Sequence, residues 1–196
     1  MCTNFYQPLP TVLKLESFAQ DSLIASTSTR LGLWVVEYQI RYAGRMNPEE
    51  LLQTYNENAR AFIAAARAVP ESRFNIRPTE KEWSAAFIIH HIADAELQFG
   101  VRYANTLAEE NPPIVPFDEE RLPIGLRYEL RSVAVSLAAF EAAHNLNYEI
   151  LKNATFEDWN RTSIHPERGP VYLSSLVKLS GGHIGGHIEQ LSSLID

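Results

Sequence analysis

The amino-acid sequence predicts an all-α protein, a bundle of four long helices that follows an N-terminal extension. Three observations lead to this fold class. Four long segments carry apolar residues at the three- and four-residue spacing of an amphipathic helix. The segments that connect them are rich in proline and polar residues. Finally, the chain shows no convincing set of segments with the alternating pattern of β-strands.

Composition and charge exclude several classes of protein. Apolar residues make up 45% of the 196 residues and charged residues 21%, which is typical of a globular protein with a core. The formal net charge is −7 without a basic block, so neither nucleic acid nor a membrane is an expected partner. No apolar run is long enough to predict a transmembrane helix. We expect a cytoplasmic protein, because Cys2 is the sole cysteine and the N-terminus lacks a secretion signal.

Residues 1–45 differ in pattern from the rest of the chain. They contain short apolar stretches and a Ser/Thr-rich stretch without a sustained helical period, and we assign them no firm structure. The run from Asn47 to Glu50 then predicts a helix start, with Asn as the N-cap, Pro at the first helical position and acids in the first turn. The sequence therefore predicts an extension of residues 1–45 and a domain of residues 46–196. One hypothesis is that the extension arises from a misread start.

The first two helices have recognisable boundaries. The first is expected over about residues 48–69, with apolar residues on one face and Pro70 as its stop. The second is expected over about residues 84–110, with Ser84 as its N-cap and Asn-Pro-Pro after its end. The stripe of this second helix that faces the core contains His91.

The second half of the chain contains the other two helices. Residues 111–125 include four prolines and predict a long crossover, which allows helices to be placed across a bundle. The third helix is expected over about residues 126–153, with Leu130 and Leu146 on its packing side. After an irregular segment, the fourth helix is expected over about residues 172–194.

Two histidines in the last helix are candidate metal ligands. His183 and His187 stand four residues apart and so lie on one face, beside four glycines. Imidazole nitrogens bind divalent metals, and His91 can supply a third ligand from another helix, which leaves a coordination position open for catalysis. Two alternatives remain open from spacing alone: the pair arises by chance, or a core histidine is held by hydrogen bonds. The glycines can either open a cavity or allow close helix packing.

Several short motifs follow one another in a specific order. They are Trp83 before the second helix, His90-His91-Ile92-Ala93-Asp94, Arg102, the segment 109–119, His165-Pro166 and the C-terminal His-x-x-x-His. In order and spacing they resemble the DinB-like superfamily, and within it the YfiT-type metal-dependent hydrolases, over about residues 47–196. The C-terminal segment departs from the family pattern, which is often richer in histidine and aromatic residues.

The resemblance implies a fold, a cofactor and partners. Members of that superfamily are four-helix bundles, up-down-down-up in most cases, that hold a divalent metal ion with three histidines. Carried over by position, the implied ligands are His91, His183 and His187, and the implied metal is zinc or nickel. The resemblance also implies a small-molecule substrate, a thiol cosubstrate in some relatives, and a homodimer.

Three further polar residues are candidates for the site, although no catalytic residue is assigned. Asp94 can orient a histidine, Arg102 can bind an anionic group of a substrate, and His165 can act as an acid or base. The alternatives are an ion pair of Asp94 with Arg102 or a neighbouring helix, and a surface His-Pro turn for His165. His90 and His144 are treated as ordinary helix residues, with His90 near the flank of its helix.

Three functions are compatible with these observations. The first is a metal-dependent hydrolase, the name that the resembling group carries. The second is an S-transferase that uses a low-molecular-weight thiol, which suits a site without an evident general base. The third is a non-catalytic metal-binding module of a stress response. A metal-free helical interaction protein is the remaining alternative.

Overall fold

The computed structural model describes residues 47–195, so the predicted extension of residues 1–45 lies outside the described residues. Its elements in chain order are α2 (Pro48–Ala68), η1 (Glu71–Arg73), α3 (Ala85–Ala108), α4 (Arg121–Gly125), η2 (Tyr128–Leu130), α5 (Val133–Lys152), η3 (Asp158–Asn160), β1 (Thr162–His165), β2 (Gly169–Tyr172) and α6 (Leu173–Ser192). Among these residues no helix is both long and apolar enough to cross a bilayer.

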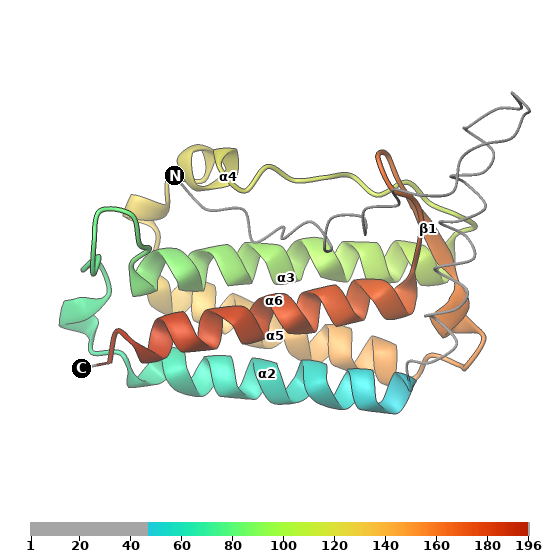
Figure 1. Cartoon of the computed structure of the whole chain (residues 1–196), viewed down its shortest axis with the longest axis horizontal. Helices are drawn as coiled ribbons and strands as arrows, with labels where there is room; N and C mark the ends of the chain where they lie inside the picture. Colours follow the sequence, from blue (N-terminus) through green and yellow to red (C-terminus); the bar gives the residue numbers. More distant parts are fainter. Residues whose placement is uncertain (1–46, 196) are drawn as a thin grey trace, which may run out of the picture. The chain divides into compact units, whose positions relative to one another are not determined.

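The four long helices form a bundle, as the sequence predicts (Figure 1). Helix α2 packs against α5 and α6, and helix α3 packs against the same two helices. His90 contacts Ser136 and Glu96 contacts Asn147, so α3 and α5 run in the same direction. Figure 1 shows that α2 and α6 also run in the same direction, opposite to the first pair. Helices that are consecutive in the chain therefore lie diagonally opposite at two of the three connections.

Side-chain caps mark the starts of α2, α3 and α5. The Asn47 side chain accepts a hydrogen bond from the Glu49 amide (3.0 Å), and the Ser84 hydroxyl accepts one from the Phe87 amide (3.3 Å). Both caps were expected from the sequence, because short oxygen-bearing side chains satisfy amides that have no partner within the helix.

The predicted start of the third helix is wrong by seven residues. Arg127 adopts a left-handed conformation (φ 50°), and η2 follows it, so α5 begins only at Val133 with Ser132 as its cap. Leu130 and Leu146, expected on the packing side, are 74% and 62% exposed. The helical spacing of apolar residues continues from α5 back into the end of the crossover, so the sequence pattern did not show that the helix starts only at Val133.

A short β-hairpin at one end of the bundle replaces part of the predicted irregular segment. Strands β1 and β2 are antiparallel, and Ile164 of β1 also exchanges two backbone hydrogen bonds of 2.8 Å with the crossover at Pro112 and Ile114. Arg161 donates from Nε to the Thr106 carbonyl (2.7 Å), near the C-terminus of α3. The crossover between the parallel helices α3 and α5 is therefore attached to the hairpin and returns along the bundle (Figure 1).

Candidate metal centre

Three histidines from two neighbouring helices meet inside the bundle. His91 lies in the second turn of α3, and His183 and His187 lie one turn apart on α6. The Nε2 atom of His183 is 3.0 Å from Nε2 of His91 and 3.2 Å from Nε2 of His187. One nitrogen from each ring lies within 4.8 Å of the other two. The structure thus brings together the three residues that the sequence singled out.

The arrangement of these nitrogens fits a divalent ion. Two nitrogens that each bind a tetrahedral zinc ion at ~2.0–2.1 Å are about 3.3 Å apart, close to the observed 3.0 and 3.2 Å. The Nδ1 atom of His187 is 2.6 Å from Oε1 of Gln190, an acceptor, so Nδ1 carries the proton. This leaves the Nε2 lone pair of His187 directed at the other two rings. A set of three such donors leaves at least one coordination position for water or substrate.

The protein environment keeps the three rings neutral. Burial, and secondarily the neighbouring His187, lowers the pKa of His91 to about 3. Burial also lowers the pKa of His183 to about 3, with smaller contributions from His187 and His91. For His187 burial lowers the pKa, although its contact with Gln190 acts in the opposite direction. Neutral imidazole is the form that binds metals, so the rings are ready to act as ligands near neutral pH.

Aromatic side chains line one side of the three histidines. The Trp83 ring stacks on His187 (5.7 Å between centroids, 10° between planes) and meets His91 edge-on at 5.0 Å. Phe87 packs between Trp83 (4.5 Å) and Tyr128 (5.3 Å). Trp83, which the sequence singled out as part of the motif series, is half-buried against two of the candidate ligands. This aromatic wall of Trp83, Phe87 and Tyr128 packs through Trp83 against His91 and His187 and covers one side of these two rings.

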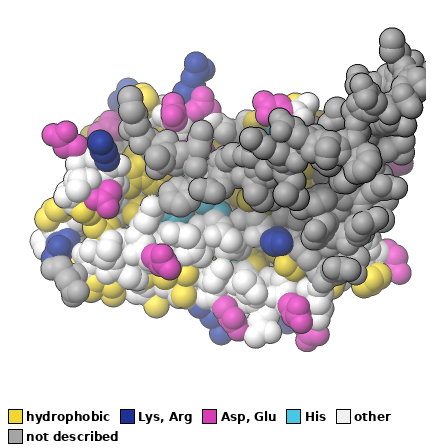
Figure 2. All heavy atoms as spheres, viewed as in Figure 1, with side chains coloured by type: hydrophobic (Ala, Val, Ile, Leu, Met, Phe, Trp, Pro, Cys, Tyr) yellow, Lys and Arg dark blue, Asp and Glu magenta, His cyan; other side chains and the backbone are white. Residues whose placement is uncertain are grey.

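The four glycines of α6 have two different roles. A Cβ atom on Gly181 would lie 3.3 Å from the α2 backbone, and one on Gly185 would lie 2.8 Å from Nδ2 of Asn58. These two glycines therefore permit the close packing of α6 on α2. A Cβ atom on Gly182 or Gly186 would meet no atom of residues 47–195 within 4 Å. In the space-filling view, histidine atoms reach the surface on the face that shows α6 (Figure 2).

Asp94 binds an arginine and a tyrosine, and its hydrogen bonds do not reach a histidine ring. Arg131 forms two hydrogen bonds to its carboxylate (2.8 and 2.7 Å), and the Tyr128 hydroxyl donates a third (2.6 Å). Burial, followed by this contact with Asp94, raises the pKa of Tyr128 above its ordinary range. Asp94 therefore attaches the crossover to α3 and fixes Tyr128 in the aromatic wall. Of the expected alternatives, the ion pair is observed, with Arg131 in place of Arg102.

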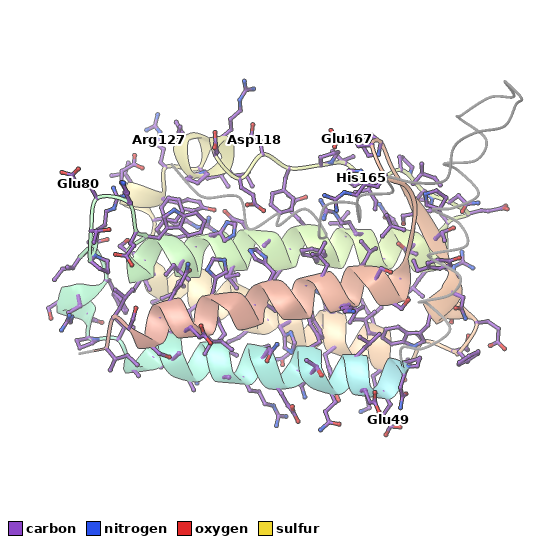
Figure 3. All side chains as sticks on the ribbon, in the orientation of Figure 1. Glu49, Glu80, Asp118, Arg127, His165 and Glu167 are labelled. Atoms are coloured by element: carbon purple, nitrogen blue, oxygen red, sulfur yellow. The ribbon has the colours of Figure 1, made fainter. Side chains whose placement is uncertain are left out.

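Arg102 and His165 lie away from the three histidines. Arg102 follows His91 by eleven residues, or about 16 Å along α3. Its guanidinium donates to the Val115 carbonyl (3.2 Å) and covers the rings of Phe99 and Phe117. The imidazole of His165, at the end of β1, accepts a hydrogen bond from the backbone of the hairpin turn (3.2 Å; Figure 3). Neither side chain belongs to the cluster of possible metal ligands.

His90 differs from the expectation that it lies near the flank of its helix. It is 1% exposed, because α5 covers that side of α3, and its Nδ1 atom is 2.8 Å from the Ser136 hydroxyl. Burial, followed by the charge of Arg131, lowers the pKa of His90 to about 4. Sequence reasoning also missed Gln190, although its position three residues after His187 places both on one face of α6.

A model of the DinB superfamily matches residues 53–191. The chain belongs to this superfamily. Two relatives, from Oceanobacillus iheyensis and Bacillus cereus, are named provisionally as metal-dependent hydrolases. Each is 30% identical over 112 residues, which cover 57% of this chain. The match spans 64% of the length of each relative.

Solved structures share the DinB fold. YfiT from Bacillus subtilis, described as having an unusual four-helix bundle topology, has a TM-score of 0.66 at 22% identity and covers 76% of this chain and 87% of its own. A mycothiol-dependent maleylpyruvate isomerase has a TM-score of 0.64 at 13% identity and covers 76% of this chain and 62% of its own. At these identities the likeness establishes the fold alone.

Proposed function

We propose that this DinB protein is a metal-dependent hydrolase of a small-molecule substrate. Its cofactor is one divalent ion, zinc or nickel, held by the Nε2 atoms of His91, His183 and His187. The observation that carries the proposal is the convergence of these three atoms at 3.0 and 3.2 Å. The chemistry that such an ion supplies is the activation of water or a thiol and the polarisation of a substrate.

The residues of the chain have separate tasks in this proposal. The three histidines bind the ion with neutral rings, so two positive charges remain to act on the substrate. Gln190 holds the proton of His187 on Nδ1, the nitrogen that faces away from the other rings. Trp83, packed against Phe87, covers one side of His91 and His187. The names of the Oceanobacillus and Bacillus relatives support hydrolysis as the reaction class.

A thiol-dependent transferase or isomerase is the second candidate. Among residues 47–195, the hydrogen-bond partners of the three histidines are one another and Gln190, so no carboxylate is hydrogen-bonded to them as a general base. A thiol that is bound to a metal ion is deprotonated without a separate base. The fold shared with a mycothiol-dependent isomerase agrees with this alternative.

Elemental analysis of the purified full chain tests the metal site. We expect about one equivalent of zinc or nickel in the parent, and loss of the metal in His91→Ala and His183→Ala. The control is His165→Ala, which removes a histidine on the hairpin and should leave the metal content unchanged. A parent protein without metal after chelator-free purification would refute the proposed cofactor.

Activity assays then separate the two reaction classes. The loaded protein is incubated with a panel of ester, amide and phosphate substrates, and separately with an electrophilic dye and a low-molecular-weight thiol. The proposal predicts hydrolysis that disappears in His183→Ala. Conjugation of the dye without hydrolysis would favour the transferase, and neither reaction in a metal-loaded protein would favour a non-catalytic module.

A further inference from the structure

A second polar cluster lies in the core of the bundle, around the buried carboxylate of Glu96. This side chain is 1% exposed. The Tyr55 hydroxyl and the Asn147 amide (2.7 Å) donate to its Oε1 atom, and the Ser180 hydroxyl (3.4 Å) donates to Oε2. All four long helices therefore contribute a side chain to this cluster. This cluster shares no residue with the proposed ligands or with the aromatic wall.

The partners of Glu96 are those expected for an ionised carboxylate. Tyr55, Asn147 and Ser180 all donate, and an ionised carboxylate only accepts hydrogen bonds. Burial, followed by the neighbouring Tyr103 and Glu96, raises the pKa of Tyr55 above its ordinary range. Its hydroxyl therefore keeps the proton that it donates. The cluster places one negative charge in the centre of the bundle.

No lysine or arginine of the described residues neutralises this charge. The ion pairs among residues 47–195 include none between Glu96 and a permanent cation. His144 Nδ1 lies 3.8 Å from the carboxylate, beyond hydrogen-bond distance, and its Nε2 atom is 3.3 Å from Oδ1 of Asn56. Asp94, by contrast, is paired with Arg131. Because burying an unpaired charge destabilises a fold, a nearby cation in the core would stabilise it.

Glu96 and Ser180 each lie within about one and a half helical turns of a proposed ligand on the same helix. Glu96 follows His91 by five residues, or about 7.5 Å along the axis of α3. Ser180, which donates to Glu96, precedes His183 by three residues, or about 4.5 Å along α6. Opposite charges attract one another more strongly in the protein interior than in water. Three neutral histidines leave both charges of a divalent ion uncompensated, and Glu96 can balance one of them.

We propose that Glu96 is a positioning residue of the metal centre, whose negative charge holds a divalent cation at the three histidines without coordinating it. This inference rests on the proposed function, because it requires that the histidines bind an ion. It assigns to the buried polar cluster the task of keeping a charged carboxylate within reach of the ion. The three donors satisfy the oxygens of the buried carboxylate.

The test compares the zinc affinity of four full-length proteins by competition with a chromophoric chelator. Glu96→Gln keeps the shape of the side chain and removes its charge, so we expect zinc to bind at least about tenfold more weakly. Glu96→Asp keeps the charge, and Tyr55→Phe keeps it while removing one hydrogen bond. Both variants are expected to bind zinc within about threefold of the parent. Thermal melts of the metal-free proteins establish that each is folded.

Two outcomes would overturn the role of Glu96. Equal zinc affinity in the parent and in Glu96→Gln would show that the charge has no effect, and the proposed metal site would stand. A loss of tenfold or more in folded Glu96→Asp or Tyr55→Phe would show that packing of the cluster, not its charge, determines affinity. A parent protein that binds no zinc or nickel would instead refute the proposed function itself.

Discussion

Gln190 determines which nitrogen of His187 is available to an ion. Its Oε1 atom accepts the Nδ1 proton at 2.6 Å, and the Nε2 lone pair then faces the other two rings. Trp83 stacks on the same imidazole and restricts its rotation. The orientation of a candidate ligand therefore depends on two neighbours that are not candidate ligands themselves.

Replacing Gln190 should weaken metal binding without removing a ligand. In Gln190→Ala the Nδ1 proton loses its acceptor, so both tautomers of His187 become accessible, and we expect zinc affinity to fall about 10- to 100-fold. Chelator competition measures the change. The control is Glu189→Ala, an exposed neighbour on α6 that should leave the affinity unchanged. Equal affinities in the two variants would contradict the role of Gln190.

Residue patterns predicted the positions of the three histidines but not their surroundings. Helical spacing places His183 and His187 on one face, and the apolar stripe of α3 turns His91 inward. The partner of Asp94 could not be found in this way, because Arg131 comes from the crossover, a segment whose path depends on tertiary structure. The burial of His90 was missed for the same reason, since it depends on where α5 packs.

Helix α6 combines poor helix-forming residues with close packing. Gly181 and Gly185 lie where a methyl group would meet α2, whereas at Gly182 and Gly186 it would meet none of the residues that the structure describes. Sequence alone left cavity and packing as equal alternatives for these glycines. Only the register of α6 against α2 separates the two pairs.

Alanine substitutions should divide the glycines of α6 into the same pairs. Gly182→Ala and Gly186→Ala are expected to stabilise the protein by about 0.5–1 kcal/mol, because alanine is the better helix former and has room. Gly181→Ala should be less stable than either by about 1 kcal/mol or more, since the backbone of α2 must move. Urea denaturation of the metal-free proteins measures these differences. An equal increase in stability in Gly181→Ala, Gly182→Ala and Gly186→Ala would contradict the packing role of Gly181.

Element boundaries were predictable where a local signal exists. Asn47 and Ser84 cap α2 and α3 as expected. The start of α5 was missed because an apolar stretch continued through the left-handed turn at Arg127. The β-hairpin was missed because its strands have four residues each, too few to show alternation.

At the scale of the whole molecule, the parallel arrangement of α3 with α5 and of α2 with α6 creates the candidate site. It places α3 beside α6, so that residues about ninety positions apart meet at His91 and His183. The four-helix class was predictable from periodicity, and the up-down-down-up order was implied only by the family resemblance. Spacing alone does not specify which helices are neighbours.

The buried histidines should make the metal-free protein sensitive to acid. The pKa values of His91 and His183 are lowered to about 3, and that of His90 to about 4, from the 6.5 of a free histidine. Below about pH 6.5 the unfolded chain takes up protons that the folded chain does not, so stability is full above that pH and falls towards pH 3–4. Between the pKa of the unfolded chain and that of the folded protein, each such histidine lowers the free energy of unfolding by up to about 1.4 kcal/mol for each pH unit of acidification.

Urea midpoints of the metal-free protein at pH 7.5 and 5.5 measure this effect. We expect a lower midpoint at pH 5.5, and a smaller decrease in His183→Ala, which lacks one of the buried rings. Equal decreases in the two proteins would contradict a contribution of His183 to the pH dependence.

The central claim is that three histidines form one metal site. A crystal of the full chain grown with zinc, with diffraction data collected on both sides of the zinc absorption edge, tests it most directly. We expect one anomalous peak about 2.0–2.1 Å from the Nε2 atoms of His91, His183 and His187. A crystal with no peak at these atoms, or with zinc bound only elsewhere, would contradict it.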